Sequence, residues 1–441
     1  MNKLVSCVEQ HIRSVPAINH VVVAYSGGVD SHVLLHICAQ LRPQLKDITF
    51  QAVYIDHGLH ENSSRWSAHC KQVALKLDIE YISQKVFAKD INGDGPEQAA
   101  RLARYKALSK YIDKQTLLLT AQHQDDQAET LLLQLLRGSG VKGLSSMPLL
   151  SKFEGGYLLR PFLDCSKQSI SDYAATHTLS WVEDPSNLDV SYDRNFLRQS
   201  VIPLIKQRWP AFSKTTSRSA AHCAEASTIL TDLASTLLQD ALVDKLELSL
   251  LVTLNDETQR LVIRQWLADH KIRMPSEKVL EEIQRLVVQP LVKSACIKLG
   301  DQQLRLFDAC FFIVTQEIEA FPFIDWIGNK VMLPACMGDL SFIEVTGAGI
   351  DKELWESSRI SIRCRQGGES LKVAGRLGHK KLKKLLYENK IFPWVRNIIP
   401  LIYLDGQLVA VADLWVDENY LVMEGEKGYL PQWNHPDLRI Q

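Results

Sequence analysis

Short apolar runs alternate with stripes at helical spacing over residues 20–145, and this alternation predicts a layered α/β domain. The apolar runs at 21–25, 50–55 and 116–120 are continuous, which is typical of parallel strands buried on both faces. Helical spacing follows at 33–38, 66–77, 97–112 and 127–136, and a short strand is expected at 80–83. Strands that alternate with helices form βαβ units. We therefore expect a doubly wound parallel sheet whose ligands bind beyond the carboxyl ends of the strands.

The pattern changes after about residue 215. Apolar stripes at helical spacing continue to about residue 287, and strand-like runs follow at 304–307 and 311–314. Beyond a Pro/Gly-rich passage at 321–349, the last hundred residues mix short strands at 360–363 and 408–412 with one basic helix near 379–389. We expect three domains: an α/β domain at 1–215, a mostly helical domain at 216–320, and a small mixed α+β domain at 321–441.

Composition agrees with this division and narrows the class of protein. A chain of 441 residues suits about three domains of ~150 residues each. No apolar run reaches the ~18 residues of a membrane span, and the N-terminus lacks a signal-peptide core, so we expect no membrane partner and a cytoplasmic location. The nine cysteines are scattered without a C-x-x-C pair, which indicates reduced thiols and argues against a zinc ribbon or iron–sulfur cluster.

The strongest candidate for chemistry is the turn after the first strand, Ser26-Gly27-Gly28-Val29-Asp30-Ser31. At a strand-to-helix turn, free backbone N–H groups and the positive end of the helix dipole make an anion site. The two glycines allow a phosphate to approach the backbone, and the two serines add hydroxyl donors. An ordinary tight turn is the alternative. We predict that all six residues bind the phosphates of a nucleotide.

This turn is not a Walker A loop, because no lysine follows the glycines and no G-x-x-x-x-G-K-[ST] occurs. It carries Asp30 instead. A carboxylate beside phosphates repels them unless a divalent cation lies between. The sequence therefore predicts Mg²⁺ at Asp30.

A second polar cluster follows the strand at 116–120. If a helix begins near Asp125, then Asp126, Glu129 and Thr130 share one of its faces. Helix capping explains Asp125 well and explains Glu129 less well. We expect Asp126 to share Mg²⁺ with Asp30 or to take a proton from an amine nucleophile, and Glu129 to pair with a cationic substrate.

Two pairs of arginines lie one helical turn apart. Arg101 and Arg104 could neutralise phosphate charge in a transition state, or they could form a solvated helix face. Arg194 and Arg198 make a basic face that suits a phosphodiester backbone, with ordinary solvation as the alternative. His57 and His60 lack a third ligand at usable spacing, so we interpret them as polar lining rather than a metal site.

Local charge matters because the net charge is only −1. Residues 359–384 contain nine Lys and Arg against the single acid Glu369, and Tyr387, Phe392 and Trp394 follow. Positive side chains near aromatic rings suit RNA with unstacked bases, whereas a solubility patch is the weaker explanation. We predict that Lys380, Lys381, Lys383 and Lys384 bind RNA.

Taken together, these segments resemble the tRNA(Ile)-lysidine synthase family, whose loop at 26–31 is the PP-loop of ATP-dependent adenylating enzymes. The similarity covers most of the chain. One departure is Gln122, which takes the first place of two adjacent histidines that the family often has. The motifs that carry the resemblance are S-G-G-V-D-S at 26–31, D-H-G-L at 56–59, Arg101 and Arg104 with Tyr105, D-D-Q-A-E-T at 125–130, D-P-S-N at 184–187 before Arg194, Trp266 with Pro275-Ser276, and G-H-K-K-L-K-K at 378–384 before Pro393-Trp394.

The resemblance implies a two-step ligation. ATP adenylates the C2 oxygen of the wobble cytidine in a tRNA(Ile) with a CAU anticodon, and the ε-amine of free L-lysine then displaces AMP. Asp30 and Asp126 would bind Mg²⁺ or assist deprotonation, Glu129 would hold the lysine, and Arg101 or Arg104 would stabilise phosphate charge. The basic patch would bind the tRNA away from the anticodon.

Three other functions compete with this one. A PP-loop tRNA thiolase would need a nucleophilic cysteine or a cysteine-bound cluster, usually paired. A small-molecule amidating synthetase would not need the patch at 359–384. A non-catalytic tRNA-binding protein would not need Asp30, Asp126 and Glu129.

Overall fold

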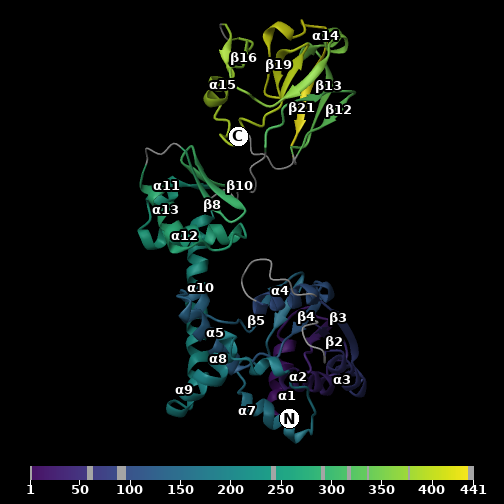
Figure 1. The fold of residues 1–441 in the computed structure, drawn as a ribbon, viewed down its shortest axis with the longest axis vertical. Helices are drawn as coiled ribbons and strands as arrows, with labels where there is room; N and C mark the ends of the chain where they lie inside the picture. Colours follow the sequence, from purple (N-terminus) through teal and green to yellow (C-terminus); the bar gives the residue numbers. More distant parts are fainter. Residues whose placement is uncertain are drawn as a thin grey trace. The chain divides into compact units, whose positions relative to one another are not determined.

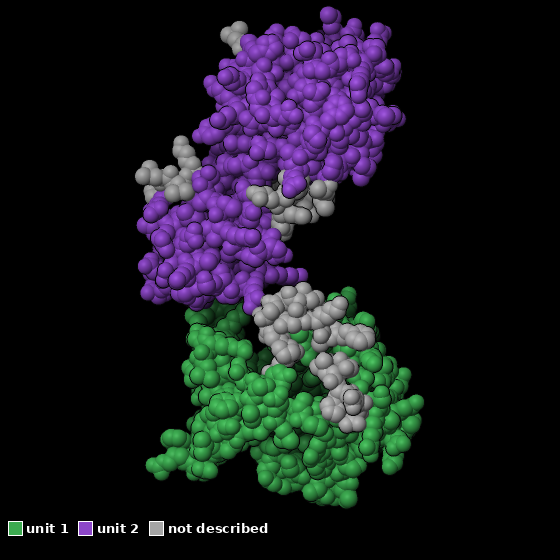
Figure 2. Space-filling model, in the orientation of Figure 1, with its two compact units in different colours: residues 1–231 green, residues 232–441 purple. Residues whose placement is uncertain are grey.

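The chain forms two compact units, residues 1–231 and 232–441 (Figure 2). The computed structural model describes residues 2–56, 63–86, 96–239, 245–289, 294–314, 319–334, 337–375 and 378–435. The division between the units falls within α10 (Phe212–Leu238), so the three-domain division at 215 and 320 stays a prediction. Among the described residues, no helix is long and apolar enough to cross a membrane.

The first unit is built on a six-stranded sheet, which confirms the predicted α/β class (Figure 1). The strand order is β3-β2-β1-β4-β6-β5, and β5 is an antiparallel edge strand beside five parallel strands. The sequence pattern missed the short hairpin of β5 and β6. The strands are β1 (His20–Ala24), β2 (Thr49–Asp56), β3 (Glu80–Lys85), β4 (Thr116–Leu119), β5 (Leu150–Phe153) and β6 (Gly156–Leu159).

Helices follow most strands of this sheet, and further helices extend the unit toward residue 231. A π-helical turn at Leu197–Val201 joins α8 to α9. The helices are α1 (Lys3–Arg13), α2 (Val29–Leu41), α3 (Ser63–Lys76), α4 (Pro96–Leu108), α5 (Gln124–Leu136), α6 (Val141–Leu144), α7 (Lys167–Thr176), α8 (Asp193–Phe196), α9 (Ile202–Arg208) and α10.

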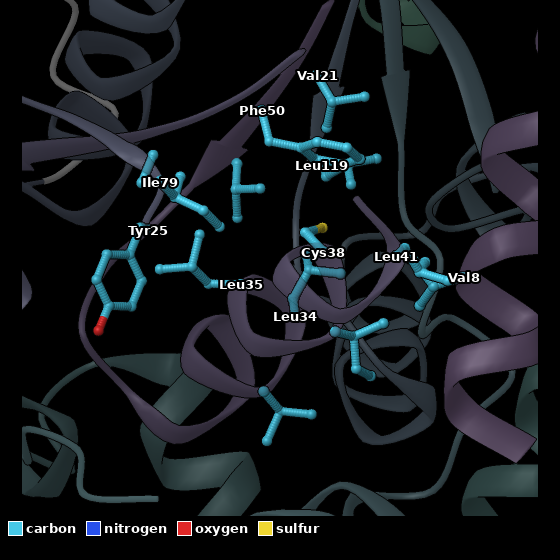
Figure 3. Packing of buried hydrophobic residues seen from close by; sticks show 14 of the residues in the cluster. Val8, Val21, Tyr25, Leu34, Leu35, Cys38, Leu41, Phe50, Ile79 and Leu119 are labelled. Carbon is cyan, nitrogen blue, oxygen red and sulfur yellow. The ribbon is translucent and has the colours of Figure 1, made fainter. Parts of the chain in front are cut away.

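The two faces of the sheet bury separate apolar clusters, because successive strand residues point to opposite faces. Val21 of β1 packs in one cluster with Leu34 and Leu35 of α2 (Figure 3). Val22 packs in the other cluster with Leu108 of α4. Burial on both faces explains why the strands read as continuous apolar runs. It also holds the carboxyl edge of the sheet in one geometry.

The second unit begins with helices packed on a small antiparallel sheet. The sheet order is β7-β10-β9-β8, so the region predicted to be mostly helical also carries four strands. Stripes on α12 and α13 supply its core, including Trp266 and Ile283. The elements are β7 (Lys245–Glu247), α11 (Leu248–Val252), α12 (Asp256–Asp269), α13 (Glu277–Val288), β8 (Ser294–Leu299), β9 (Gln302–Phe307) and β10 (Cys310–Val314).

The rest of the second unit is mixed α+β, as predicted, and α15 (Leu382–Glu388) lies within the predicted basic helix at 379–389, whereas α14 (Lys352–Ser357) was not indicated by the sequence pattern. Its core includes Trp355, Leu385 and Val409. The elements are β11 (Ile324–Asp325), β12 (Lys330–Met332), β13 (Asp339–Thr346), β14 (Ile350–Asp351), α14 (Lys352–Ser357), β15 (Ile360–Arg363), β16 (Ser370–Leu371), β17 (Lys380–Lys381), α15 (Leu382–Glu388), β18 (Leu401–Leu404), β19 (Gln407–Val411), β20 (Trp415–Val416) and β21 (Lys427–Asn434).

Candidate active site

The candidate site lies at the carboxyl edge of the parallel sheet, where the strand order changes direction between β1 and β4. The loop at 25–28 follows β1, and the loop at 120–123 follows β4. Open α/β sheets bind ligands at such a switch point, because neighbouring loops there turn to opposite sides. The two motifs singled out in the sequence therefore meet at one place.

The glycine loop is held in a conformation that only glycine adopts easily. Gly27 has φ +84°, and a Cβ at this position would lie 2.7 Å from Sγ of Cys70. The carbonyl of Gly27 accepts a hydrogen bond from the N–H of Val182 (3.0 Å). Gly28 is the N-cap of α2 with φ −73°. A side chain at position 27 is thus excluded by both backbone conformation and packing.

The serines of the motif brace the loop from within. Oγ of Ser31 donates to the carbonyl of Gly28 (3.0 Å) and accepts from the N–H of Ser26 (3.2 Å). The two hydroxyl oxygens lie 3.1 Å apart. Helix α2 begins at Val29, so first-turn N–H groups at this end have no partner within the helix. The arrangement fits a bound phosphate, and the ATP-binding role of 26–31 stays a prediction.

Asp30 contacts a lysine and a histidine from other elements. Nζ of Lys167 donates to Oδ1 of Asp30 (2.5 Å), and Nε2 of His123 lies 3.7 Å from Oδ2. Burial alone would raise the pKa of Asp30, but His123 and Lys167 lower it further than burial raises it. Burial lowers the pKa of His123, whereas Asp30 and Asp126 raise it above its ordinary value. This part of the site is therefore a charged network.

Helix α5 begins one residue earlier than expected, and Asp126 rather than Asp125 makes its capping bond. Oδ2 of Asp126 accepts from the N–H of His123 (3.0 Å) and lies 3.4 Å from His123 Nε2. Asp125, which capping seemed to explain, accepts instead from Nζ of Lys206 (2.8 Å). His123 therefore contacts the carboxylates of both Asp30 and Asp126, which brings the two acids expected to share a cation to one point.

Glu129 is a buried carboxylate that forms ion pairs with two arginines. Its side chain is 1% exposed. Nε of Arg194 donates to Oε2 (2.8 Å), and Arg198 donates to both oxygens, with Nε at 2.6 Å from Oε1 and Nη2 at 2.8 Å from Oε2. Arg198 also reaches Oδ1 of Asp126 (3.1 Å). Arg194 and Arg198, which were predicted to form a basic face, therefore pair with acids of the site.

These contacts stabilise the protonated form of Arg198. Burial lowers the pKa of Arg198, but Glu129, Asp126 and Asp30 raise it above its ordinary value. Removal of one partner from such a cluster leaves an uncompensated buried charge. Each charge in the cluster therefore depends on the others.

Arg101 lies on α4, with its guanidinium carbon 5.0 Å from the ring centroid of Tyr105. Sequence reasoning missed Arg160, which follows β6 and is buried, with Nη1 donating to the carbonyl of Pro148 (2.7 Å). Burial lowers the pKa of Arg160. The only signal was a strand end at 159, and the run before it is too short to read as a strand.

Four buried polar atoms at this edge have no hydrogen-bond partner among the described residues. Unmade hydrogen bonds of this kind cost about 1–3 kcal/mol each, so several together at a strand edge indicate a polar ligand. They follow β4 and β6, and they are Thr120 Oγ1, Gln122 Oε1, His123 Nδ1 and Arg160 Nε.

A cavity of about 490 Å³ opens beside the buried acid. Both signs of charge and an aliphatic wall line it. Its lining residues are Asp125, Glu129, Arg198, Ile202, Pro203, Lys206 and Gln207. A zwitterion with an alkyl chain matches this combination.

The basic patch of the second unit is more open than the site. Lys381, Lys383 and Lys384 are exposed, and Lys384 lies 3.8 Å from Glu388. Lys380, Lys381 and Lys383 have no acidic partner in the part of the chain that is described. Arg376, His57 and His60 lie outside the described residues. Of the predicted aromatics, Tyr387 is exposed, whereas Phe392 is buried and stacked on Trp394.

Cys70 lies beside the glycine loop, but its thiol does not suit the mechanism of a tRNA thiolase. Sγ of Cys70 lies against the glycine loop, but burial raises the pKa of Cys70 to about 12. Sulfur transfer needs a thiolate, and this thiol stays protonated at neutral pH. All cysteines among the described residues are free.

Family profiles match three segments of the chain. A PP-loop domain matches residues 3–205, a TilS substrate binding domain matches 246–310, and a TilS substrate C-terminal domain matches 360–433. The first match contains the whole glycine loop and the acids of α5. The third contains the four lysines of the predicted patch.

Curated relatives agree with these profiles. The tRNA(Ile)-lysidine synthase of Methylococcus capsulatus is 39% identical, covering 88% of this chain and 90% of the relative. Those of Coxiella burnetii and Serratia proteamaculans are 38% and 37% identical, covering 93% and 96% of this chain and 91% and 98% of the relatives. These matches favour a ligase over the thiolase alternative. The chain belongs to the tRNA(Ile)-lysidine synthase family, whose members are PP-loop ligases.

Proposed function

We propose that this chain ligates free L-lysine to C2 of the wobble cytidine in a tRNA(Ile) with a CAU anticodon. ATP is consumed in the reaction, and AMP and pyrophosphate are released. Family membership supports the reaction class. The observation that carries the proposal is the juxtaposition of a phosphate-type loop, at Asp30, with a cavity that bears both charges, at Glu129.

The first step is adenylation of the tRNA base. The C2 oxygen of cytidine attacks the α-phosphorus of ATP, and pyrophosphate leaves. The loop at 26–31 would hold the phosphates through its N–H groups and hydroxyls. Arg101, Arg104 and the buried Arg160 would offset charge that develops on the phosphate oxygens.

A divalent cation fits the acids of the loop. When bound, Mg²⁺ would neutralise phosphate charge and polarise the phosphorus–oxygen bonds. Asp30 and Asp126 both contact His123, so their carboxylates can face one cation. The two carboxylates would supply part of the ligand set, and water and phosphate would supply the rest.

The cavity beside α5 is the proposed lysine site. Glu129 and Asp125 would hold the α-ammonium or position the ε-amine, and Arg198 and Lys206 would bind the α-carboxylate. Ile202 and Pro203 would cover the alkyl chain of lysine. Lysine binding must open the contacts of Arg194 and Arg198 with Glu129, because both carboxylate oxygens are already occupied.

The second step is attack by the ε-amine of lysine on C2. The bond from C2 to the adenylated oxygen breaks, and AMP leaves with that oxygen. The amine must lose its proton before it attacks, and we assign Asp126 to accept that proton. Protein carboxylates and the departing AMP thus share the protons that the reaction releases.

Binding of tRNA would depend on Lys380, Lys381, Lys383 and Lys384 in the second unit. Lysines attract a polyanion and release its counterions on binding, and Lys380, Lys381 and Lys383 have no acidic partner among the described residues. Arg194 and Arg198 would reach RNA only after they leave Glu129.

The free state of the described cysteines suits a location in the cytoplasm.

The test is lysine transfer with purified protein. The chain is incubated with ATP, Mg²⁺, radiolabelled lysine and bulk bacterial tRNA, and the tRNA is then precipitated with acid. Mild alkali strips lysine esters from the 3′ end of tRNA. We expect label that survives alkali, because a C–N bond to a base resists it. Release of AMP without stable label would contradict the proposal and favour another nucleophile.

A further inference from the structure

Lys167 contacts Asp30, and no sequence pattern indicated this pairing. It is the first residue of α7, and its Nζ lies 2.5 Å from Oδ1 of Asp30. The Lys167 side chain is 37% exposed and that of Asp30 is 30% exposed, so the pair borders solvent.

We propose that Lys167 is the phosphate-binding lysine of this site, held on Asp30 until nucleotide and a divalent cation bind. The ammonium then leaves Asp30 for the pyrophosphate oxygens of ATP. This inference rests on the proposed use of ATP, but not on lysine or tRNA as the later substrates.

The loop itself creates the need for such a residue. A Walker loop supplies a lysine to the β- and γ-phosphates from its own G-K-[ST] sequence, and residues 26–31 contain no cation. A leaving pyrophosphate gains negative charge and is stabilised by a nearby ammonium. Lys167 reaches the loop from α7, far along the chain, and its Nζ already touches the motif.

The backbone around Lys167 is fixed, so that only its side chain has to move. Oγ of Ser166 accepts from the N–H of Ser169 (3.2 Å) and caps α7. The carbonyl of Cys165 accepts from the N–H of Gln124 (3.1 Å), which ties this segment to the start of α5. A flexible four-carbon stem on a fixed helix end lets a point charge shift between two oxygen sites.

Electrostatics gives the reason for the shift. One oxygen of Asp30 binds Lys167, and the other faces His123. A divalent cation at this carboxylate would stand a few ångströms from the ammonium, and like charges at that distance repel. Phosphates arriving with the cation offer Lys167 a new partner. Lys167 therefore competes with the metal when nucleotide is absent and assists ATP when it is present.

The test is Lys167→Met, read by two binding measurements whose signs differ. Without nucleotide, Mn²⁺ binding followed by its paramagnetic resonance should become at least about 3-fold tighter, because the competing ammonium is gone. ATP binding in the presence of Mg²⁺, measured by calorimetry, should become about 10–100-fold weaker. A residue with only a structural role would weaken both.

Two variants complete the design. Gln168→Met alters the neighbouring residue on α7, which contacts Asp172 and not Asp30, and should leave both affinities as in the wild type. Lys167→Arg keeps the charge and should restore most of the ATP affinity. If Lys167→Met does not fold, Lys167→Gln is measured in its place.

The outcomes are decisive either way. Unchanged ATP affinity, or Mn²⁺ binding that is not tighter, would overturn the role of Lys167. Both measurements omit lysine and tRNA. Failure of lysine transfer with the two affinities as predicted would therefore refute the proposed ligation and leave this inference standing.

Discussion

The site of the first unit and the basic patch of the second unit handle charge in opposite ways. At the site each acid has a cation: Lys167 on Asp30, Lys206 on Asp125, and two arginines on Glu129. In the patch, Lys380, Lys381 and Lys383 have no acidic partner among the described residues. The contrast suggests different ligands for the two surfaces.

A paired site suits small reactants that bring both signs of charge. Buried charges cost several kcal/mol unless they are compensated, so the protein supplies its own counterions until substrate replaces them. An open patch suits a polyanion, because binding breaks no ion pairs within the protein and releases counterions from the polyanion. Charge variants should therefore affect folding at the site and salt dependence at the patch.

Glu129→Gln should have the largest effect. It leaves Arg194 and Arg198 facing a neutral amide, and we expect the rate of lysine transfer to fall at least about 100-fold. The free energy of unfolding should fall by about 3 kcal/mol, at the low end of the range for buried pairs because Arg198 is 41% exposed. Label incorporation and urea denaturation measure the two effects.

The matched variant is Asp125→Asn, which breaks the more exposed pair with Lys206. It should cost less than about 1 kcal/mol of stability. Equal stability losses for the two variants would contradict the claim that Glu129 is the buried centre of the network.

Gly27→Ala should have the next largest effect, and Gly378→Ala in the patch is its partner. Both glycines have positive φ, which costs alanine about 1–2 kcal/mol. Only at Gly27 does the new Cβ meet an atom, Sγ of Cys70 at 2.7 Å, which adds about 1–3 kcal/mol. Thermal unfolding should separate the two variants, and equal losses would show that the loop is not tightly packed.

The patch prediction uses two triple variants of equal charge. Replacing Lys380, Lys381 and Lys383 by Ala should flatten the slope of log affinity for tRNA against log salt by about 2–3. The control replaces Lys330, Lys352 and Lys427, which pair with Asp339 or Glu344 at 2.6–2.9 Å. Filter binding over a range of salt measures both, and similar slopes for the two variants would remove the patch from the account.

The smallest effect concerns the protonation of His123. Its folded pKa lies above the unfolded value of about 6.5, so the stability it contributes is fully present below about pH 6.5 and is lost as pH rises through the folded pKa. In His123→Gln this pH dependence should vanish, as unfolding measured across neutral pH can test. An unchanged profile would mean that His123 is not the source of this pH dependence.

Local patterns predicted one part of the site and missed another. The glycine loop is visible because strand, turn and helix are contiguous, and Asp126 and Glu129 are visible because they share one helix face. Lys167 and Arg160 were missed because their contacts arise when distant segments meet at the sheet edge. A lysine at the start of an amphipathic helix reads as a solvated residue until its partner is known.

The fold shows the same division. Long apolar runs identified β1, β2 and β4, whereas the hairpin of β5 and β6 and the three-residue β7 are too short to give a periodic signal. The sequence pattern also did not indicate that Arg194 and Arg198 pair with Glu129. Helical spacing shows that two arginines share a face, but it does not show which element that face meets.

The central claim is that lysine is joined to the wobble base, and the mass of that base tests it most directly. Purified protein is incubated with ATP, Mg²⁺, lysine and tRNA(Ile) that has a CAU anticodon, and the RNA is digested to fragments for mass spectrometry. The account predicts that the anticodon fragment gains the mass of one lysine less one water. An anticodon fragment of unchanged mass while AMP is released would contradict it.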